Sequence, residues 1–180
     1  MVRQGDCKPS VGGGPRIGVL GDSISAGYNR WPYNVPGTIL NHAVAGQDVV
    51  NNMDAQTVAA ASDSAEIIII ALGTNDDGSA GNMAALQAEY EENVAELKVS
   101  NAGATIYAMN VLPRWTDVGG GTPVDRSSIR TAIAAACTSQ GITCWDTFTT
   151  PWIAANETLD GLHPNVVGSA KIAAQVIARL

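Results

Sequence analysis

Three side chains of this sequence have the types and spacing that nucleophilic acyl chemistry requires. Ser23 follows a Gly-Asp pair in a turn-rich peptide, and Asp160 precedes His163 by three residues near the C-terminus. A serine hydroxyl becomes a good nucleophile when a base takes its proton, and an imidazole held by a carboxylate is such a base. We therefore expect Ser23, His163 and Asp160 to act together, which requires a fold that joins the two ends of the chain.

Attack on an ester carbonyl also requires hydrogen-bond donors for the oxyanion that forms. Asn75 offers a side-chain amide, and Gly46 offers a backbone N–H with no Cβ to block its approach. The backbone N–H of Ser23 is a third donor. Donors aimed at the developing charge are typically worth about 2.7–4 kcal/mol each, so these three positions are the predicted oxyanion hole.

Short apolar stretches alternate with helical stretches along the chain, and this order predicts the architecture. The stretch over 66–72 contains four consecutive isoleucines and no polar face, which is typical of a strand covered on both sides in a parallel sheet. We expect an α/β fold, a three-layer α/β/α sandwich with a five-stranded parallel sheet. The expected strands span 16–20, 38–44, 66–72, 105–112 and 142–146, and the expected helices span 48–61, 82–100, 124–140 and 165–179.

The candidate residues follow the expected strands, where ligand sites of such sheets lie, and their motifs resemble those of the SGNH hydrolases, also called the GDSL esterase/lipase family. In chain order the motifs are Gly21-Asp22-Ser23, Gly46, Gly73-Thr74-Asn75-Asp76 and Asp160-Gly161-Leu162-His163-Pro164. The resemblance covers about residues 16–180. It implies a flavodoxin-like arrangement, with catalytic Ser23, Asp160 and His163 and an oxyanion hole of Ser23, Gly46 and Asn75.

The stretch between Ser23 and Gly46 is shorter than in many members of that family, and its two prolines disfavour a long helix. Side chains near the candidate turns are expected to contact substrate, because aromatic faces suit sugar or aryl groups and arginine suits a carboxylate. They are Tyr28, Arg30, Trp31, Arg114, Trp115 and Leu162. A role as loop anchors stays open for Trp31 and Trp115, and residues 116–123 are a candidate flap.

Four other polar residues near these motifs are expected to be structural. Asp22 is expected to hydrogen-bond the backbone of its own turn, and Asp76 and Asp77 to cap the loop that contains them. His42 is expected to be a structural residue within the strand over 38–44.

The amino-acid composition limits the classes of partner that the protein can bind. Of the 180 residues, 46% are hydrophobic and 15% charged, which indicates a globular chain. We expect a polar, flexible N-terminal arm over 1–15 and one domain over 16–180. The net charge of −7 without a basic stripe disfavours nucleic acid as a partner, and the longest apolar run is too short to span a membrane.

The three cysteines, Cys7, Cys137 and Cys144, are an odd number without a CxxC pair, which disfavours a zinc site. The expected chemistry needs no metal and no cofactor. Cys137 and Cys144 are close enough in sequence to pair, so both a disulfide and two buried thiols stay open. No apolar leader follows Met1. A mature secreted protein without its leader is one expectation, and a cytoplasmic location is the other.

These features together predict a serine esterase that hydrolyses short-chain acyl esters through an acyl-enzyme intermediate. A carbohydrate acetylesterase is favoured, because the domain is small, has no long apolar lid and has tryptophans near the site. The expected partner is therefore a small-molecule or carbohydrate ester. A lysophospholipase, thioesterase or arylesterase could use the same residues. The alternatives of another kind are a non-catalytic binding module on the same fold and acyl transfer to an acceptor other than water.

Overall fold

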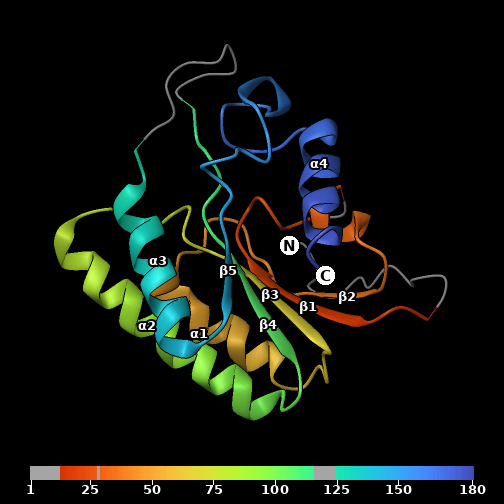
Figure 1. Ribbon diagram of the computed structural model, residues 1–180, viewed down its shortest axis with the longest axis vertical. Helices are drawn as coiled ribbons and strands as arrows, with labels where there is room; N and C mark the ends of the chain where they lie inside the picture. The colour runs from red at the N-terminus through yellow and green to blue at the C-terminus, as the bar shows by residue number, and fades with distance from the viewer. Residues whose placement is uncertain (1–12, 28, 116–124) are drawn as a thin grey trace.

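A parallel five-stranded sheet forms the centre of the computed structural model, which describes residues 13–27, 29–115 and 125–180 (Figure 1). The strands run in the order β2-β1-β3-β4-β5. They are β1 (Arg16–Gly21), β2 (Thr38–Asn41), β3 (Ile67–Ala71), β4 (Thr105–Met109) and β5 (Thr143–Trp145). The helices are α1 (Val49–Ala60), α2 (Ala80–Ser100), α3 (Ser127–Gln140) and α4 (Val166–Ile177), with short 3₁₀-helices η1 (Trp31–Asn34) and η2 (Ala155–Glu157).

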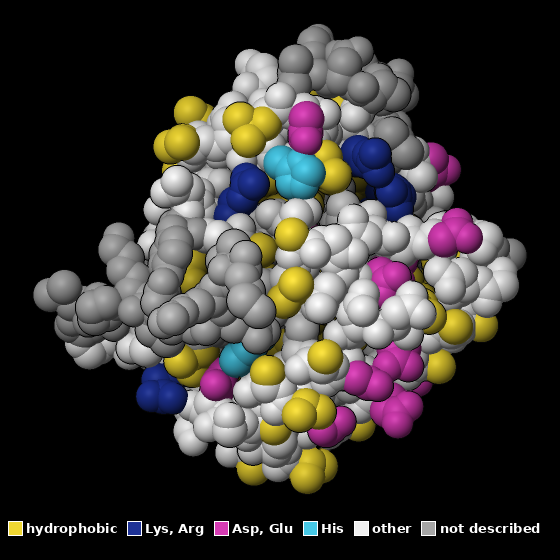
Figure 2. All heavy atoms as spheres, turned by 180° about the vertical axis from the view of Figure 1, so that it is seen from behind, with side chains coloured by type: hydrophobic (Ala, Val, Ile, Leu, Met, Phe, Trp, Pro, Cys, Tyr) yellow, Lys and Arg dark blue, Asp and Glu magenta, His cyan; other side chains and the backbone are white. Residues whose placement is uncertain are grey.

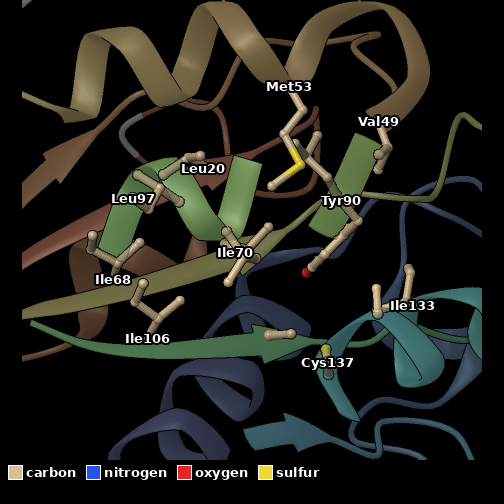
Figure 3. Packing of buried hydrophobic residues seen from close by; sticks show 14 of the residues in the cluster. Leu20, Val49, Met53, Ile68, Ile70, Tyr90, Leu97, Ile106, Ile133 and Cys137 are labelled. Atoms are coloured by element: carbon tan, nitrogen blue, oxygen red, sulfur yellow. The ribbon is translucent and has the colours of Figure 1, made fainter. Parts of the chain in front are cut away.

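The helices cover both faces of the sheet. Figure 1 shows α1, α2 and α3 on one face and α4 on the other. The isoleucines of β3 alternate between these layers: Ile68 and Ile70 pack with Met53, Tyr90 and other residues of the first layer, as Figure 3 shows. Ile69 packs on the opposite face, in the cluster that includes residues of α4. The expected three-layer α/β/α sandwich is confirmed.

The strand order reverses direction beside β1, because β2 lies on one side of β1 and β3 on the other. In open α/β sheets, such a switch point is where ligands bind, beyond the carboxyl ends of the strands. Gly21, the last residue of β1, pairs with Ala71, the last residue of β3. The peptides that carry Ser23 and Asn75 therefore leave the sheet side by side.

Four of the five strands are shorter than expected, and the largest differences are at the ends of β2 and β4. β2 ends at Asn41, whose side-chain Oδ1 accepts the backbone N–H of Ala43. The N–H groups of His42 and Val44 still donate to the carbonyls of Val19 and Gly21 in β1, at 2.8 and 3.0 Å. His42 thus follows the strand rather than lying inside it, and its ring is hydrogen-bonded to Asp63. β4 ends at Met109 because the next peptides use side chains as partners. Thr147 Oγ1 donates to the carbonyl of Val111 at 2.8 Å, for example.

Cys137 and Cys144 are free thiols in this structure, so the disulfide that the sequence left open is not formed. The neighbouring thiol of Cys144, together with burial, raises the pKa of Cys137 well above its ordinary value. In the described part of the chain, no helix is long and apolar enough to cross a membrane. Of the expected N-terminal arm, residues 1–12 lie outside the described residues.

Candidate active site

Ser23 lies in a tight turn directly after β1. The backbone N–H groups of Ser25 and Ala26 donate to the carbonyl of Asp22 at 3.0 and 2.9 Å. The N–H of Ile24 donates to Asp22 Oδ1 at 2.9 Å, so the carboxylate also closes the turn, as expected from the sequence. Ser23 itself is half-buried. The turn therefore fixes the backbone of Ser23 and leaves its hydroxyl accessible at the end of the sheet.

The structure brings Ser23, His163 and Asp160 into one hydrogen-bonded chain. His163 Nε2 lies 2.9 Å from Ser23 Oγ, and His163 Nδ1 lies 2.6 Å from Asp160 Oδ2. A carboxylate at Nδ1 selects the tautomer with the proton on that nitrogen, which leaves Nε2 free to accept a proton from the serine. Asp160 Oδ1 accepts the backbone N–H of His163 at 2.8 Å. One carboxylate thus orients both the ring and its backbone.

The pKa of Asp160 is lowered to about 2. Burial raises this pKa, but hydrogen bonds from the backbone N–H and the ring of His163 and from the N–H of Leu162 lower it by more. Asp160 therefore stays ionised throughout the neutral range. A fixed negative charge next to the imidazole stabilises the imidazolium that forms when the ring takes a proton.

The loop that carries His163 is held from two sides. The backbone N–H of Trp115 donates to the carbonyl of Gly161 at 2.8 Å. Arg30 Nη1 donates to the carbonyl of Pro164 at 2.8 Å. Residues from the segments after β1 and β4 thus fix the loop before and after the histidine, which gives the imidazole a defined position against Ser23.

The predicted oxyanion-hole residues also lie at this end of the sheet. Gly46 has φ = +81°, a conformation that side-chain-bearing residues rarely adopt, and no atom lies within 4 Å of the place where a Cβ would stand. Asn75 is exposed, and its Nδ2 donates to the carbonyl of Gln47 at 2.8 Å. An amide NH₂ has two N–H groups, so the second can serve a ligand. The hydrogen bond to Gln47 holds the Asn75 side chain next to the loop that contains Gly46.

Asp22 is fully buried, and its Oδ2 has no hydrogen-bond partner among the described residues. Burial raises its pKa to about 6, against the N–H of Ile24, which lowers it. Between about pH 4 and pH 6 the folded state therefore binds more protons than the unfolded state, and this group makes the protein less stable as the pH rises. The rise from 3.8 to about 6 corresponds to about 3 kcal/mol of unfolding free energy.

We expect Asp22→Asn to remove this pH dependence. The amide keeps an acceptor for the N–H of Ile24 and carries no charge that burial would penalise. Urea unfolding at pH 4.5 and pH 7.5 should show a gain in stability for the variant over the wild type that is larger at pH 7.5. Equal differences at the two pH values would contradict the argument.

The predicted substrate-contacting residues differ in their exposure to solvent. Arg114 is exposed, Arg30 and Leu162 are partly buried, and Trp115 is only 9% exposed. Trp31 is fully buried, and its Nε1 donates to Ser25 Oγ at 3.0 Å. The prediction that Trp31 contacts substrate is therefore corrected: it anchors the nucleophile turn from inside the core. Tyr28 and the candidate flap over 116–123 lie outside the described residues.

Asp76 also differs from expectation. Its carboxylate accepts the backbone N–H of Val49 at 2.9 Å and that of Val50 at 3.4 Å, so it caps α1 rather than its own loop. Asp77 Oδ1 does accept a local N–H, that of Ser79, at 3.2 Å. The cap ties the Asn75 segment to the start of α1, which directly follows the Gly46 loop.

Two hollows flank the loop that carries His163. A groove of about 400 Å³ begins next to the nucleophile turn and is lined by Ala26, Gly27, Asn29, Arg30, Leu159, Pro164, Asn165 and Val166. A second hollow of about 320 Å³ is lined by Trp115, Pro151, Trp152, Ile153, Ala154, Ala155, Glu157 and Lys171. Figure 2 shows basic side chains on both sides of a histidine that has an acidic side chain against it, whereas most other acidic side chains gather elsewhere on that face.

Comparison with known proteins identifies the family of the chain. The model of the GDSL-like Lipase/Acylhydrolase family matches residues 19–171. The chain belongs to this family. As a member of the GDSL-like lipases and acylhydrolases it is an ester hydrolase. In the described part of this hydrolase, no group of three or more His, Cys, Asp or Glu side chains could hold a metal ion.

Solved structures share the fold of this GDSL-like hydrolase at low sequence identity. The acetyl xylan esterase AlAXEase is 11% identical with a TM-score of 0.72, and the match covers 92% of this chain and 99% of that one. The protein YXIM of Bacillus subtilis is 21% identical with a TM-score of 0.71, covering 92% and 56%. A peptidoglycan O-acetylesterase is 17% identical with a TM-score of 0.63, covering 79% and 46%. Compared by sequence with curated proteins, the chain matches none.

Proposed function

We propose that this protein is a serine esterase that hydrolyses short-chain acyl esters through an acyl-enzyme intermediate on Ser23. The observation that carries the proposal is the chain from Ser23 Oγ to His163 Nε2 at 2.9 Å and from His163 Nδ1 to Asp160 at 2.6 Å. This is the arrangement in which an imidazole can take the proton of a serine and later return it.

In the proposed reaction, Ser23 Oγ bonds to the ester carbonyl carbon while its proton moves to His163 Nε2. The carbonyl oxygen becomes an oxyanion, which accepts hydrogen bonds from the N–H groups of Ser23 and Gly46 and from the Asn75 amide. The bond from the carbonyl carbon to the alcohol oxygen then breaks, and His163 gives its proton to the departing alcohol. A water molecule then attacks the acyl carbon while His163 takes its proton. The bond from this carbon to Ser23 Oγ breaks, His163 returns the proton to Ser23 Oγ, and the acid is released.

For the substrate we propose an acetyl ester of a carbohydrate. The open groove beside Ser23 has polar lining from Asn29 and Arg30, which suits a hydroxyl-rich alcohol. The similar structures named an acetyl xylan esterase and a peptidoglycan O-acetylesterase support the same substrate class. We further propose that Arg30, Arg114, Trp115 and Leu162 contact the alcohol portion.

One observation favours a longer acyl chain instead. Leu159 and Val166 are 66% and 79% exposed, and both line the groove beside the nucleophile turn. Exposed apolar side chains of this kind can receive an alkyl chain. A lysophospholipase or thioesterase activity is therefore the second candidate function.

The experiment that tests the proposal is hydrolysis of p-nitrophenyl esters from acetyl to dodecanoyl by the wild type and by Ser23→Ala. We expect the highest kcat/KM for acetyl and butyryl esters and loss of activity in the variant. Release of acetate from acetylated xylan would then test the alcohol. A preference for octanoyl or longer chains would exclude the acetylesterase, and a folded protein without esterase activity would exclude the enzyme.

The oxyanion hole gives a separate prediction. Asn75→Ala should lower kcat for p-nitrophenyl acetate by about 10²-fold to 10³-fold with little change in KM, because its amide binds the charge that develops after attack. Asn82→Ala is the matched control, since among the described residues that amide donates to the carbonyl of Asp77 alone. A change confined to KM, or an equal loss in Asn82→Ala, would assign Asn75 another role.

A further inference from the structure

Gln56 is a buried polar residue of α1 that the proposed reaction does not use. It is 2% exposed, although it belongs to a helix whose other contacts with the sheet are largely apolar. Its Oε1 accepts the backbone N–H of Gly21 at 2.7 Å, and its Nε2 donates to the carbonyl of the same residue at 2.9 Å. Gln56 therefore binds both backbone groups of the last residue of β1, two positions before Ser23.

The same amide also reaches the loop that follows β2. Gln56 Nε2 donates to the side-chain Oε1 of Gln47, the residue after Gly46. The backbone carbonyl of Gln47 in turn accepts Asn75 Nδ2 at 2.8 Å. One buried side chain is thus connected to the segments that supply all three proposed oxyanion donors: Ser23 through Gly21, Gly46 through Gln47, and Asn75 through the carbonyl of Gln47.

Only an amide can make this set of contacts at this position. The contacts need one acceptor for the N–H of Gly21 and two donors for the oxygens of Gly21 and Gln47, and the Gln side chain supplies one carbonyl and two N–H groups. A carboxylate would lack the donors. An apolar side chain of similar length would leave the N–H of Gly21 without this partner, at a cost of about 1–3 kcal/mol for a buried group left unpaired. The carbonyl of Gly21 would keep the backbone N–H of Val44, which donates to it at 3.0 Å.

We propose that Gln56 is a positioning residue that sets the geometry of the oxyanion hole by fixing the Gly46–Gln47 loop against the end of β1. This inference rests on the proposed function. Oxyanion donors act over about 2.7–3.1 Å, so a small displacement between these segments weakens the hydrogen bonds to the transition state. The donors bind the charge that appears after attack, so the displacement lowers kcat and leaves substrate binding almost unchanged.

The test combines kinetics with a tetrahedral ligand. Phenylboronic acid adds to a serine hydroxyl and places a boron-bound oxygen where the oxyanion forms. Kinetic constants for p-nitrophenyl acetate, the inhibition constant for phenylboronic acid and the Tm are measured for wild type, Gln56→Met and Gln47→Ala. Gln87→Met is the matched control, because the Gln87 amide lies on α2 and donates to Glu91 Oε1 at 2.8 Å.

We expect Gln56→Met to lose about 10-fold to 100-fold in kcat with KM within about twofold, and the boronate inhibition constant to rise by a similar factor. Gln47→Ala keeps the carbonyl that binds Asn75 and removes only the link to Gln56, so we expect a smaller loss, about 3-fold to 10-fold. Gln87→Met should match the wild type.

A purely structural Gln56 would give a lower Tm with unchanged kcat and boronate affinity, and that result would overturn the inference. If Gln56→Met does not fold, Gln47→Ala decides: unchanged kcat and boronate affinity in that variant would also overturn it. Failure of the proposed function gives a different result. The wild type would then show no Ser23-dependent hydrolysis and no boronate inhibition, and both proposals would be withdrawn.

Discussion

Ser23→Ala is expected to lower kcat/KM for p-nitrophenyl acetate by about 10⁴-fold to 10⁶-fold. Without the hydroxyl, His163 has no nucleophile to deprotonate, and the reaction retains only the contribution of the oxyanion donors and substrate binding. The Tm should change little, because the hydroxyl is half-exposed and its hydrogen-bond partner is the imidazole, which stays anchored to Asp160. Steady-state kinetics and thermal unfolding on the same preparations measure both effects.

Ser62→Ala provides the control for this substitution. The Ser62 hydroxyl is exposed, and in the described part of the chain it donates to the carbonyl of Ala59 alone, at 3.4 Å. The variant should therefore keep wild-type activity. A Ser23→Ala variant that retains more than about one hundredth of the wild-type kcat/KM would contradict the proposed mechanism, because loss of a serine nucleophile has far larger effects.

Asp160→Asn is expected to lower kcat by about 10³-fold to 10⁴-fold. The amide can donate to His163 Nδ1 and so favour the wrong tautomer, with the proton on Nε2, where it blocks proton transfer from Ser23. Loss of charge has a smaller effect, because the Asp160 side chain is 54% exposed and water screens it. Kinetics on p-nitrophenyl acetate across pH 6–9 measure the change.

Asp77→Asn is the control, because that carboxylate is exposed and serves only a local turn. The carboxylate of Asp160 has a pKa of about 2, so the wild type should show no inflection from this group at pH 5 or above. An Asp160→Asn loss smaller than tenfold would show that the backbone of the loop alone holds the imidazole, and the proposed role of Asp160 would be wrong.

The fold could be predicted because its strongest signals are local. The four isoleucines of 67–70 require cover on both faces, and the structure places their side chains in the two core clusters, on opposite faces of the sheet. The order of strands and helices then leaves few arrangements. The ends of the elements were less predictable. β2 ends at Asn41, where the side chain accepts the N–H of Ala43, and hydrophobic periodicity does not show such a local contact.

The candidate catalytic residues could be located because their motifs are short and contiguous. Asp160 and His163 share one turn, so a single segment carries both the base and its partner. The residues that hold the site in place escaped prediction. Gln56 contacts Gly21, which is 35 residues away in the sequence. A single glutamine in a predicted helix does not indicate such a distant partner. Trp31 was misplaced for the same reason, since only the packed fold shows that its indole donates inward to Ser25.

The most direct test of the central claim is to locate the nucleophile by covalent labelling. The purified protein is treated with diethyl p-nitrophenyl phosphate, digested, and examined by peptide mass spectrometry. Ser23 Oγ would displace p-nitrophenolate and retain the diethylphosphoryl group. The account predicts one such group per chain, on Ser23, formed much more slowly in His163→Ala, with activity lost in proportion to labelling. A label on another residue, or full labelling without loss of esterase activity, would contradict it.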